Sequence, residues 1–135
     1  MLTWISTCNG AAVAGRRRSS AAPLQVLIQV NIDDEASKSG CTPDEIGAIA
    51  AAASAAPRLA LRGLMAIPAP APDRRRREVA FSRMRALFEE LRRDHAGVDT
   101  LSMGMSEDYE LAIGAGATMV RVGSALFGPR TRTVR

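Results

Sequence analysis

The sequence predicts an α/β fold built around a parallel β-sheet. From residue 24 onwards, short apolar segments typical of buried strands alternate with segments typical of helices, which is the pattern of strands joined by helical crossovers. The pattern contains four predicted strands, and such crossovers are nearly always right-handed. Because an eight-stranded α/β barrel needs about 250 residues, these strands form either a small open sheet or one part of a barrel.

The first predicted strand is LQVLIQVNI, residues 24–32. This run is almost continuously apolar, as expected for a strand covered on both faces. A helix is predicted to follow, because Thr42, Pro43 and Glu45 form a capping box with proline at the first helical position. Pro57 ends this helix, since proline cannot continue it.

The remaining elements follow in the same alternation. LALRGLMAIP at residues 59–68 predicts the second strand, VDTLSMG at 98–104 the third, and TMVRVG at 118–123 the fourth. The third and fourth strands are separated by SEDYELAIGAG, a short helix with serine at its cap and glycine at its end. An amphipathic helix is predicted between the second and third strands, from apolar residues at helical spacing: Phe81, Met84, Leu87, Phe88 and Leu91.

The composition favours a globular protein, with 47% hydrophobic and 24% charged residues. No segment approaches the roughly 18 to 20 strongly apolar residues of a membrane span, and the chain starts with its charge after its weakly apolar part, the reverse of a secretory signal. Cys8, Cys41 and His95 are too few for a disulfide framework or a metal site. We therefore expect a reduced, cytoplasmic protein with no metal and no membrane partner.

Cys41 directly precedes the first predicted helix. A helix N-terminus can lower the pKa of a thiol and make it reactive. No catalytic base or second cysteine accompanies Cys41, which favours a structural role for it.

Two runs of arginine stand out, at residues 16–18 and 74–77, in a chain with a net charge of +4. Basic runs can indicate a nucleic-acid surface. Only 4% of the residues are aromatic, and no nucleic-acid-binding motif accompanies the runs. We read residues 74–77 as the exposed start of the amphipathic helix and expect no nucleic-acid partner.

The candidate site lies where the strands end, because parallel α/β folds bind ligands beyond the carboxyl ends of their strands. Two predicted strand ends carry glycine close to serine, at residues 104–106 and 123–124. Backbone N–H groups with a nearby hydroxyl can bind a phosphate. At either end alone an ordinary serine-capped turn is the alternative, but two adjacent ends favour a shared phosphate. Glu107 and Asp108 would repel an anion unless they point away.

Arg121 lies within the otherwise apolar fourth strand. Burying a guanidinium costs several kcal/mol unless it is paired. A ligand at the strand end or an acid elsewhere in the fold could be its partner.

Three segments carry a resemblance to a known family: LQVLIQVNIDDEASKSG, LRGLMAIPAP and LSMGMSEDYELAIGAGATMVRVGSALFGPR. They resemble the pyridoxal-phosphate homeostasis proteins, single-domain relatives of the alanine racemase N-terminal barrel. The resemblance implies a (β/α)8 barrel of the TIM type, of which this chain supplies the C-terminal half, about four β/α units. It covers residues from about 23 to 130, so we expect residues 1–22 to be a non-matching tail and residues 23–135 the partial barrel.

The resemblance also implies pyridoxal 5′-phosphate as cofactor and assigns six residues to it. Its phosphate would be bound by Ser106, Gly123 and Ser124, its pyridine nitrogen would face Arg121, and its ring would lie near Met65 and Ile67.

The lysine that forms the Schiff base in this family lies on the first barrel strand, upstream of the matching part. The only lysine here, Lys38, follows the strand predicted at residues 24–32 and does not occupy that position. It is either a solvated loop lysine or a helper charge near the mouth of the pocket. We therefore expect this chain to lack the region that carries the Schiff-base lysine.

Three functions follow as expectations. The first is a non-catalytic carrier of pyridoxal phosphate that regulates the balance of vitamin B6 and amino acids. The second is a racemase-type enzyme, which would need an additional acid/base tyrosine from a second domain, whereas Tyr109 lies in a predicted helix. The third is an inactive fragment, or a half-barrel that associates with itself or with another chain.

Overall fold

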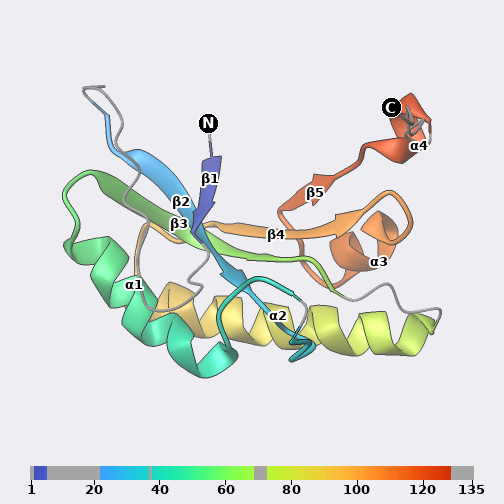
Figure 1. Ribbon diagram of the computed structural model, residues 1–135, viewed down its shortest axis with the longest axis horizontal. Helices are drawn as coiled ribbons and strands as arrows, with labels where there is room; N and C mark the ends of the chain where they lie inside the picture. Colours follow the sequence, from blue (N-terminus) through green and yellow to red (C-terminus); the bar gives the residue numbers. More distant parts are fainter. Residues whose placement is uncertain (1, 6–21, 37, 69–72, 129–135) are drawn as a thin grey trace.

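The computed structural model describes residues 2–5, 22–36, 38–68 and 73–128. Its sheet confirms the predicted α/β class, because all of its neighbouring strands are parallel. The strands lie in the sheet in the order in which they occur along the chain (Figure 1). They are β1 (Leu2–Ile5), β2 (Leu24–Val30), β3 (Leu59–Ala66), β4 (Thr100–Met105) and β5 (Met119–Arg121).

The strand β1 corrects the sequence analysis, which assigns no regular structure to residues 1–22. It pairs in parallel with β2, in a register that runs from Leu2 opposite Gln25 to Ile5 opposite Ile28. Four residues are too few to show either an alternation or a long apolar run. Strand formation here therefore depends on the neighbouring strand, which periodicity cannot detect.

Helices α1 (Ile46–Ala55), α2 (Arg74–Asp94) and α3 (Tyr109–Gly114) pack against this sheet, and α1 and α2 lie on the same face of it (Figure 1). The predicted helix after Thr42 begins with a 3₁₀ turn, in which the Glu45 carboxylate accepts a hydrogen bond from the Thr42 N–H at 2.8 Å. The helical elements are η1 (Pro43–Glu45), α1 (Ile46–Ala55), α2 (Arg74–Asp94), α3 (Tyr109–Gly114) and α4 (Ser124–Phe127).

The hydrophobic core lies between the sheet and helices α1, α2 and α3, whereas α4 contributes no buried residue. The apolar stripe predicted for α2 is confirmed, because all of its members are buried except Leu87, which is partly buried. The strands contribute the opposite wall, including Val26, Ile28, Leu64, Leu101 and Met103. Both sets remove apolar surface from water, which is the main force holding the layers together.

Gly63 lies where β3 and β4 pair closely. It pairs with Thr100 of β4 and has a φ of +151°, and a Cβ at this position would lie 1.8 Å from the Thr100 carbonyl oxygen. Only glycine fits there, because the backbone conformation is unfavourable for other residues and no space exists for a side chain.

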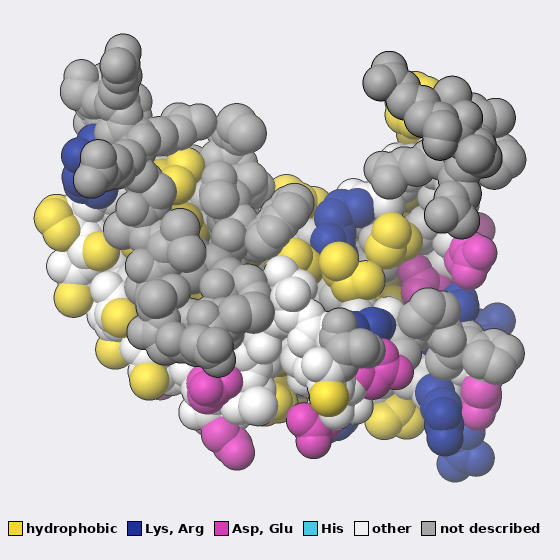
Figure 2. Space-filling view, viewed as in Figure 1, with side chains coloured by type: hydrophobic (Ala, Val, Ile, Leu, Met, Phe, Trp, Pro, Cys, Tyr) yellow, Lys and Arg dark blue, Asp and Glu magenta, His cyan; other side chains and the backbone are white. Residues whose placement is uncertain are grey.

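The arginine run at residues 74–77 begins α2, as predicted. Asp73 caps the helix by accepting a hydrogen bond from the Arg75 N–H at 2.9 Å, and Arg74 pairs with Glu78 at 2.9 Å. Figure 2 shows acidic and basic side chains intermixed over this end of α2. The run is therefore not a purely basic surface. Among the described residues, no helix is both long and apolar enough to cross a membrane.

Cys41 is buried, with 1% of its surface exposed, and its backbone links the loop after β2 to Gln29 and Asn31. Burial, assisted by the charge of Glu45, raises the pKa of its thiol from 9.0 to about 11. The structure thus supports a structural role.

We expect Cys41 to resist alkylation by iodoacetamide in the folded protein at neutral pH, because the thiolate is the reactive form. Since its folded pKa lies above the unfolded value, ionisation of Cys41 should lower stability as the pH rises from 9.0 through about 11. Mass spectrometry after alkylation checks the first result, and denaturation across that pH range, with Cys41→Ala as control, checks the second. Rapid labelling at pH 7 in the folded state would contradict this assignment.

Candidate functional site

The carboxyl ends of β3, β4 and β5 border one groove of about 890 Å³. This arrangement follows from the parallel sheet, in which neighbouring strands end at the same edge. The groove brings together five of the six predicted cofactor-binding residues: Ile67, Ser106, Arg121, Gly123 and Ser124. The sixth, Met65, is 1% exposed and lies next to the groove rather than on its surface.

Ser106 connects the ends of β4 and β5. Its hydroxyl oxygen accepts hydrogen bonds from the backbone N–H groups of Gly123 and Ala125, each at 3.2 Å. Two backbone donors therefore converge on one oxygen atom. Such converging N–H groups can also bind an anionic oxygen.

Gly123 lies open to the groove. A Cβ added there would meet nothing within 4 Å, and its φ of −125° is available to any residue. Neither packing nor backbone conformation within the described residues requires glycine at this position. Its absence of a side chain instead leaves room for a ligand to approach the backbone.

Arg121 is half-buried beside these donors. It donates one hydrogen bond to the Ala66 carbonyl oxygen at 2.7 Å and one to the Met65 sulfur at 3.3 Å. Its Nε–H is buried and has no hydrogen-bond partner in the described part of the chain, where Arg121 also makes no ion pair. Burial lowers the pKa of Arg121, and the charge of Asp108 partly opposes that shift.

Lys38 also lines the groove, although the sequence left its position open. Its ammonium group donates to the Ile67 carbonyl oxygen at 3.2 Å and lies 3.7 Å from a carboxylate oxygen of Glu35. The side chain is 22% exposed. This placement fits a charge at the groove better than a freely solvated loop lysine.

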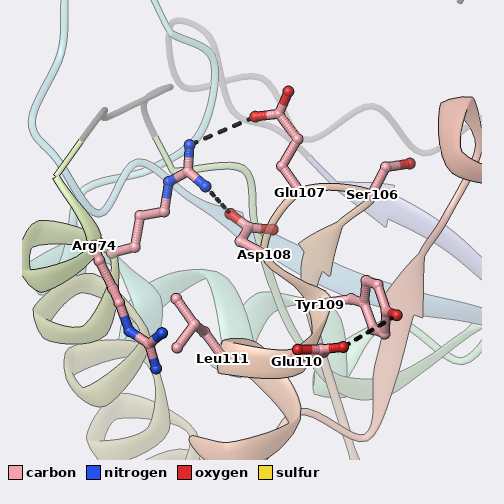
Figure 3. Close-up of a pocket in the computed structure, with 8 residues that line it drawn as sticks. Arg74, Ser106, Glu107, Asp108, Tyr109, Glu110 and Leu111 are labelled. Atoms are coloured by element: carbon pink, nitrogen blue, oxygen red, sulfur yellow. Dashed lines mark hydrogen bonds and ion pairs between the residues drawn. The ribbon is translucent and has the colours of Figure 1, made fainter.

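The carboxylates that could repel an anion are Glu107 and Asp108, and both contact one guanidinium (Figure 3). It belongs to Arg77, whose nitrogens lie 3.6 Å from Glu107 Oε2 and 3.9 Å from Asp108 Oδ2. In Figure 3 the Ser106 side chain points away from both carboxylates. Sequence analysis missed Arg77, because it stands in a run of four arginines and nothing in the run distinguishes it.

Tyr109 begins α3, and its hydroxyl donates to Glu110 at 3.4 Å. It lines a neighbouring pocket with Arg74 and Leu111 and does not border the groove that contains Arg121. Its position therefore gives no support to a catalytic tyrosine.

The sequence profile described as "Alanine racemase, N-terminal domain" matches residues 4–131. The chain belongs to this family. The match begins well before residue 23, where the resemblance in the sequence starts, and it includes part of β1.

Similar proteins in the family confirm the resemblance that the three sequence segments indicate. The chain is 49% identical over 131 residues to the pyridoxal phosphate homeostasis protein of Pseudomonas aeruginosa, and 47% identical over 131 residues to that of Escherichia coli K12. It also superimposes on the structure of PipY from Synechococcus elongatus with PLP bound, with a TM-score of 0.68 and 29% identity over 79% of this chain.

The coverage of these relatives is partial. The chain spans 56% of the Pseudomonas and Escherichia proteins and 50% of the PipY chain, while 94% of its own residues align with the two homeostasis proteins. The fold is therefore about half of a TIM-type α/β barrel. Its assignment to the C-terminal half stays a prediction.

Proposed function

We propose that this chain forms part of a pyridoxal 5′-phosphate homeostasis protein, a carrier that binds the cofactor without catalysing a reaction. Ser106, Gly123 and Ser124 bind the phosphate, and Arg121 faces the pyridine nitrogen. Met65 and Ile67 flank the ring. Because Met65 is buried beside the groove, it contributes through its contact with Arg121. The names of the similar proteins and the PLP-bound PipY structure support this proposal.

One observation carries the proposal. The N–H groups of Gly123 and Ala125 converge on the Ser106 hydroxyl, and this cluster borders the same groove as Arg121. A phosphate needs several donors within one small volume and benefits from nearby positive charge. The groove supplies the charge of Arg121, and the two N–H groups become available to a phosphate oxygen that displaces the Ser106 hydroxyl.

The residues present also fit the ring of the cofactor. The buried Nε–H of Arg121 is a hydrogen-bond donor without an acceptor among the described residues. An unprotonated pyridine nitrogen can accept a hydrogen bond. A guanidinium remains charged, so it disfavours protonation of that nitrogen. Bound pyridoxal phosphate supplies an electron sink, which is weaker when its ring nitrogen is unprotonated. This favours a carrier over an enzyme of the transaminase kind.

Lys38 contributes charge to the groove rather than covalent attachment. Its ammonium group donates to the Ile67 carbonyl and lies near Glu35, and Lys38 follows β2 rather than occupying the position that the resemblance gives to the Schiff-base lysine. We therefore propose that this chain binds the cofactor non-covalently.

Gly123→Ala tests the site without disturbing the fold. We expect unchanged or slightly higher thermal stability, because the added methyl group meets nothing within 4 Å. Binding of pyridoxal phosphate should weaken, because the methyl group occupies the ligand's approach to the backbone. The double variant Ser106→Ala/Ser124→Ala should weaken binding by roughly 1.5 to 3 kcal/mol, the range for a hydrogen bond to a charged group.

Equilibrium dialysis with pyridoxal phosphate and with inorganic phosphate measures these affinities. Gly97→Ala is a matched control, because it lies in the turn before β4, outside the groove. Equal affinity for pyridoxal phosphate in the wild type and in all site variants would contradict the proposed site. An amino-acid turnover assay with added cofactor separates carrier from enzyme, since a racemase would interconvert enantiomers.

A further inference from the structure

Two carboxylates lie beside the donors of the proposed phosphate site. Glu107 and Asp108 border the groove next to Ser106, and their side chains are 81% and 14% exposed. A phosphate bound at Ser106 would share the groove with these two negative charges, and the interaction between like charges is unfavourable. The site therefore needs a group that offsets these carboxylates.

Asp108 also shapes the turn that carries Ser106. Its Oδ1 atom accepts from the Met105 N–H at 2.7 Å, and its own N–H donates to the Met105 carbonyl oxygen at 3.1 Å. These two hydrogen bonds close the turn around residues 106 and 107. The position of the Asp108 side chain therefore influences where the Ser106 hydroxyl lies.

Arg77 is the residue that contacts both carboxylates. It comes from the first turn of α2, and its side chain is only 16% exposed, whereas its neighbour Arg74 is 76% exposed. Its Nε–H is buried without a partner among the described residues. Burying a guanidinium at this position is costly unless opposite charges compensate it, and here they come from the loop between β4 and α3.

We propose that Arg77 is a positioning residue for phosphate binding, which neutralises Glu107 and Asp108 and holds the Met105–Asp108 turn so that Ser106 faces the groove. This inference rests on the proposed function. Among the described residues that line the groove, three are cations (Lys38, Arg77 and Arg121) and two are carboxylates. Without Arg77 this balance falls from positive to zero, which disfavours a dianionic phosphate ester.

The test compares three variants of this chain. Arg77→Gln removes the charge, Arg77→Lys restores it, and the triple variant Arg77→Gln/Glu107→Gln/Asp108→Asn removes the carboxylate charges as well. Asparagine at position 108 can still accept the hydrogen bond from Met105. Affinities are measured by equilibrium dialysis for pyridoxal 5′-phosphate and for pyridoxal, which has no phosphate, and circular dichroism monitors folding.

We expect Arg77→Gln to weaken binding of pyridoxal phosphate roughly tenfold, which corresponds to about 1.4 kcal/mol. Arg77→Lys and the triple variant should recover most of this loss, and pyridoxal binding should change little. A loss that the triple variant does not recover, or that is equal for pyridoxal, would show a general structural role and overturn the inference.

The inference and the proposed function fail in different ways. Absence of pyridoxal phosphate binding by the wild-type chain overturns the proposed function, and the inference with it. Normal binding by a folded Arg77→Gln variant overturns the inference alone. If Arg77→Gln does not fold, Glu107→Gln gives the reciprocal test at an exposed side chain. Removal of that carboxylate should strengthen phosphate binding, and unchanged or weaker binding would contradict the inference.

Discussion

Replacing Gly63 with alanine is expected to lower the free energy of unfolding by about 3 to 5 kcal/mol, enough to unfold a domain of marginal stability. The added Cβ would lie 1.8 Å from the Thr100 carbonyl oxygen, in a backbone conformation with a φ of +151°. Relief of that clash requires β3 and β4 to separate where they pair. The loss therefore combines backbone strain with broken strand pairing.

Gly47→Ala is the matched control for this prediction. Gly47 lies in α1, where an added Cβ meets nothing within 4 Å, so alanine should raise stability by roughly 0.5 to 1 kcal/mol through its higher helix propensity. Urea denaturation followed by circular dichroism compares the three proteins. A Gly63→Ala variant as stable as the wild type would mean that β3 and β4 approach each other less closely than described.

The isolated chain is expected to self-associate. Among the described strands, β1 and β5 each pair with one neighbour only, so both edges of the sheet carry backbone groups that can pair with another chain. Leu126 and Phe127 of α4 are also 71% and 87% exposed. A closed barrel has no such edges, and exposed edges together with apolar side chains promote association.

Sedimentation velocity over a range of protein concentrations measures this association. Leu126→Glu should reduce it without a large loss of stability, because the residue is exposed and does not line the groove. Ser82→Glu, an exposed position on α2, is a control for added charge alone. A monodisperse monomer with a cooperative thermal transition would contradict the prediction.

The sequence predicted the elements whose signal lies within a single segment. The strands at residues 24–30 and 59–66 are long apolar runs, and the stripe of Phe81, Met84 and Phe88 repeats at helical spacing. The strand β1 has no such signal, since its four residues depend on pairing with β2. The residue pattern of one segment predicts the secondary structure of that segment. It does not predict which distant segments pair, because that depends on the three-dimensional fold.

The same distinction applies to the site. Strand ends meet at one edge of a parallel sheet, so their order along the chain was enough to place Ser106 near Gly123. The contact between Arg77 and Asp108 could not be predicted in this way, because it joins α2 to a loop about thirty positions later and depends on how the two pack. Likewise, the thioether contact between Arg121 and Met65 depends on side-chain geometry.

The described strands lie in the sheet in the order in which the ribosome makes them. Each strand pairs with the one made just before it, so a nascent chain can extend its sheet as each β/α unit emerges, without waiting for distant segments. At each stage the newest strand presents a free edge for the next one, while the outer edge of β1 stays unpaired among the described strands. Arg121 lies on β5, the last of the described strands to be made, so the groove at the carboxyl ends of β3, β4 and β5 is completed only after the other described strands have been synthesised.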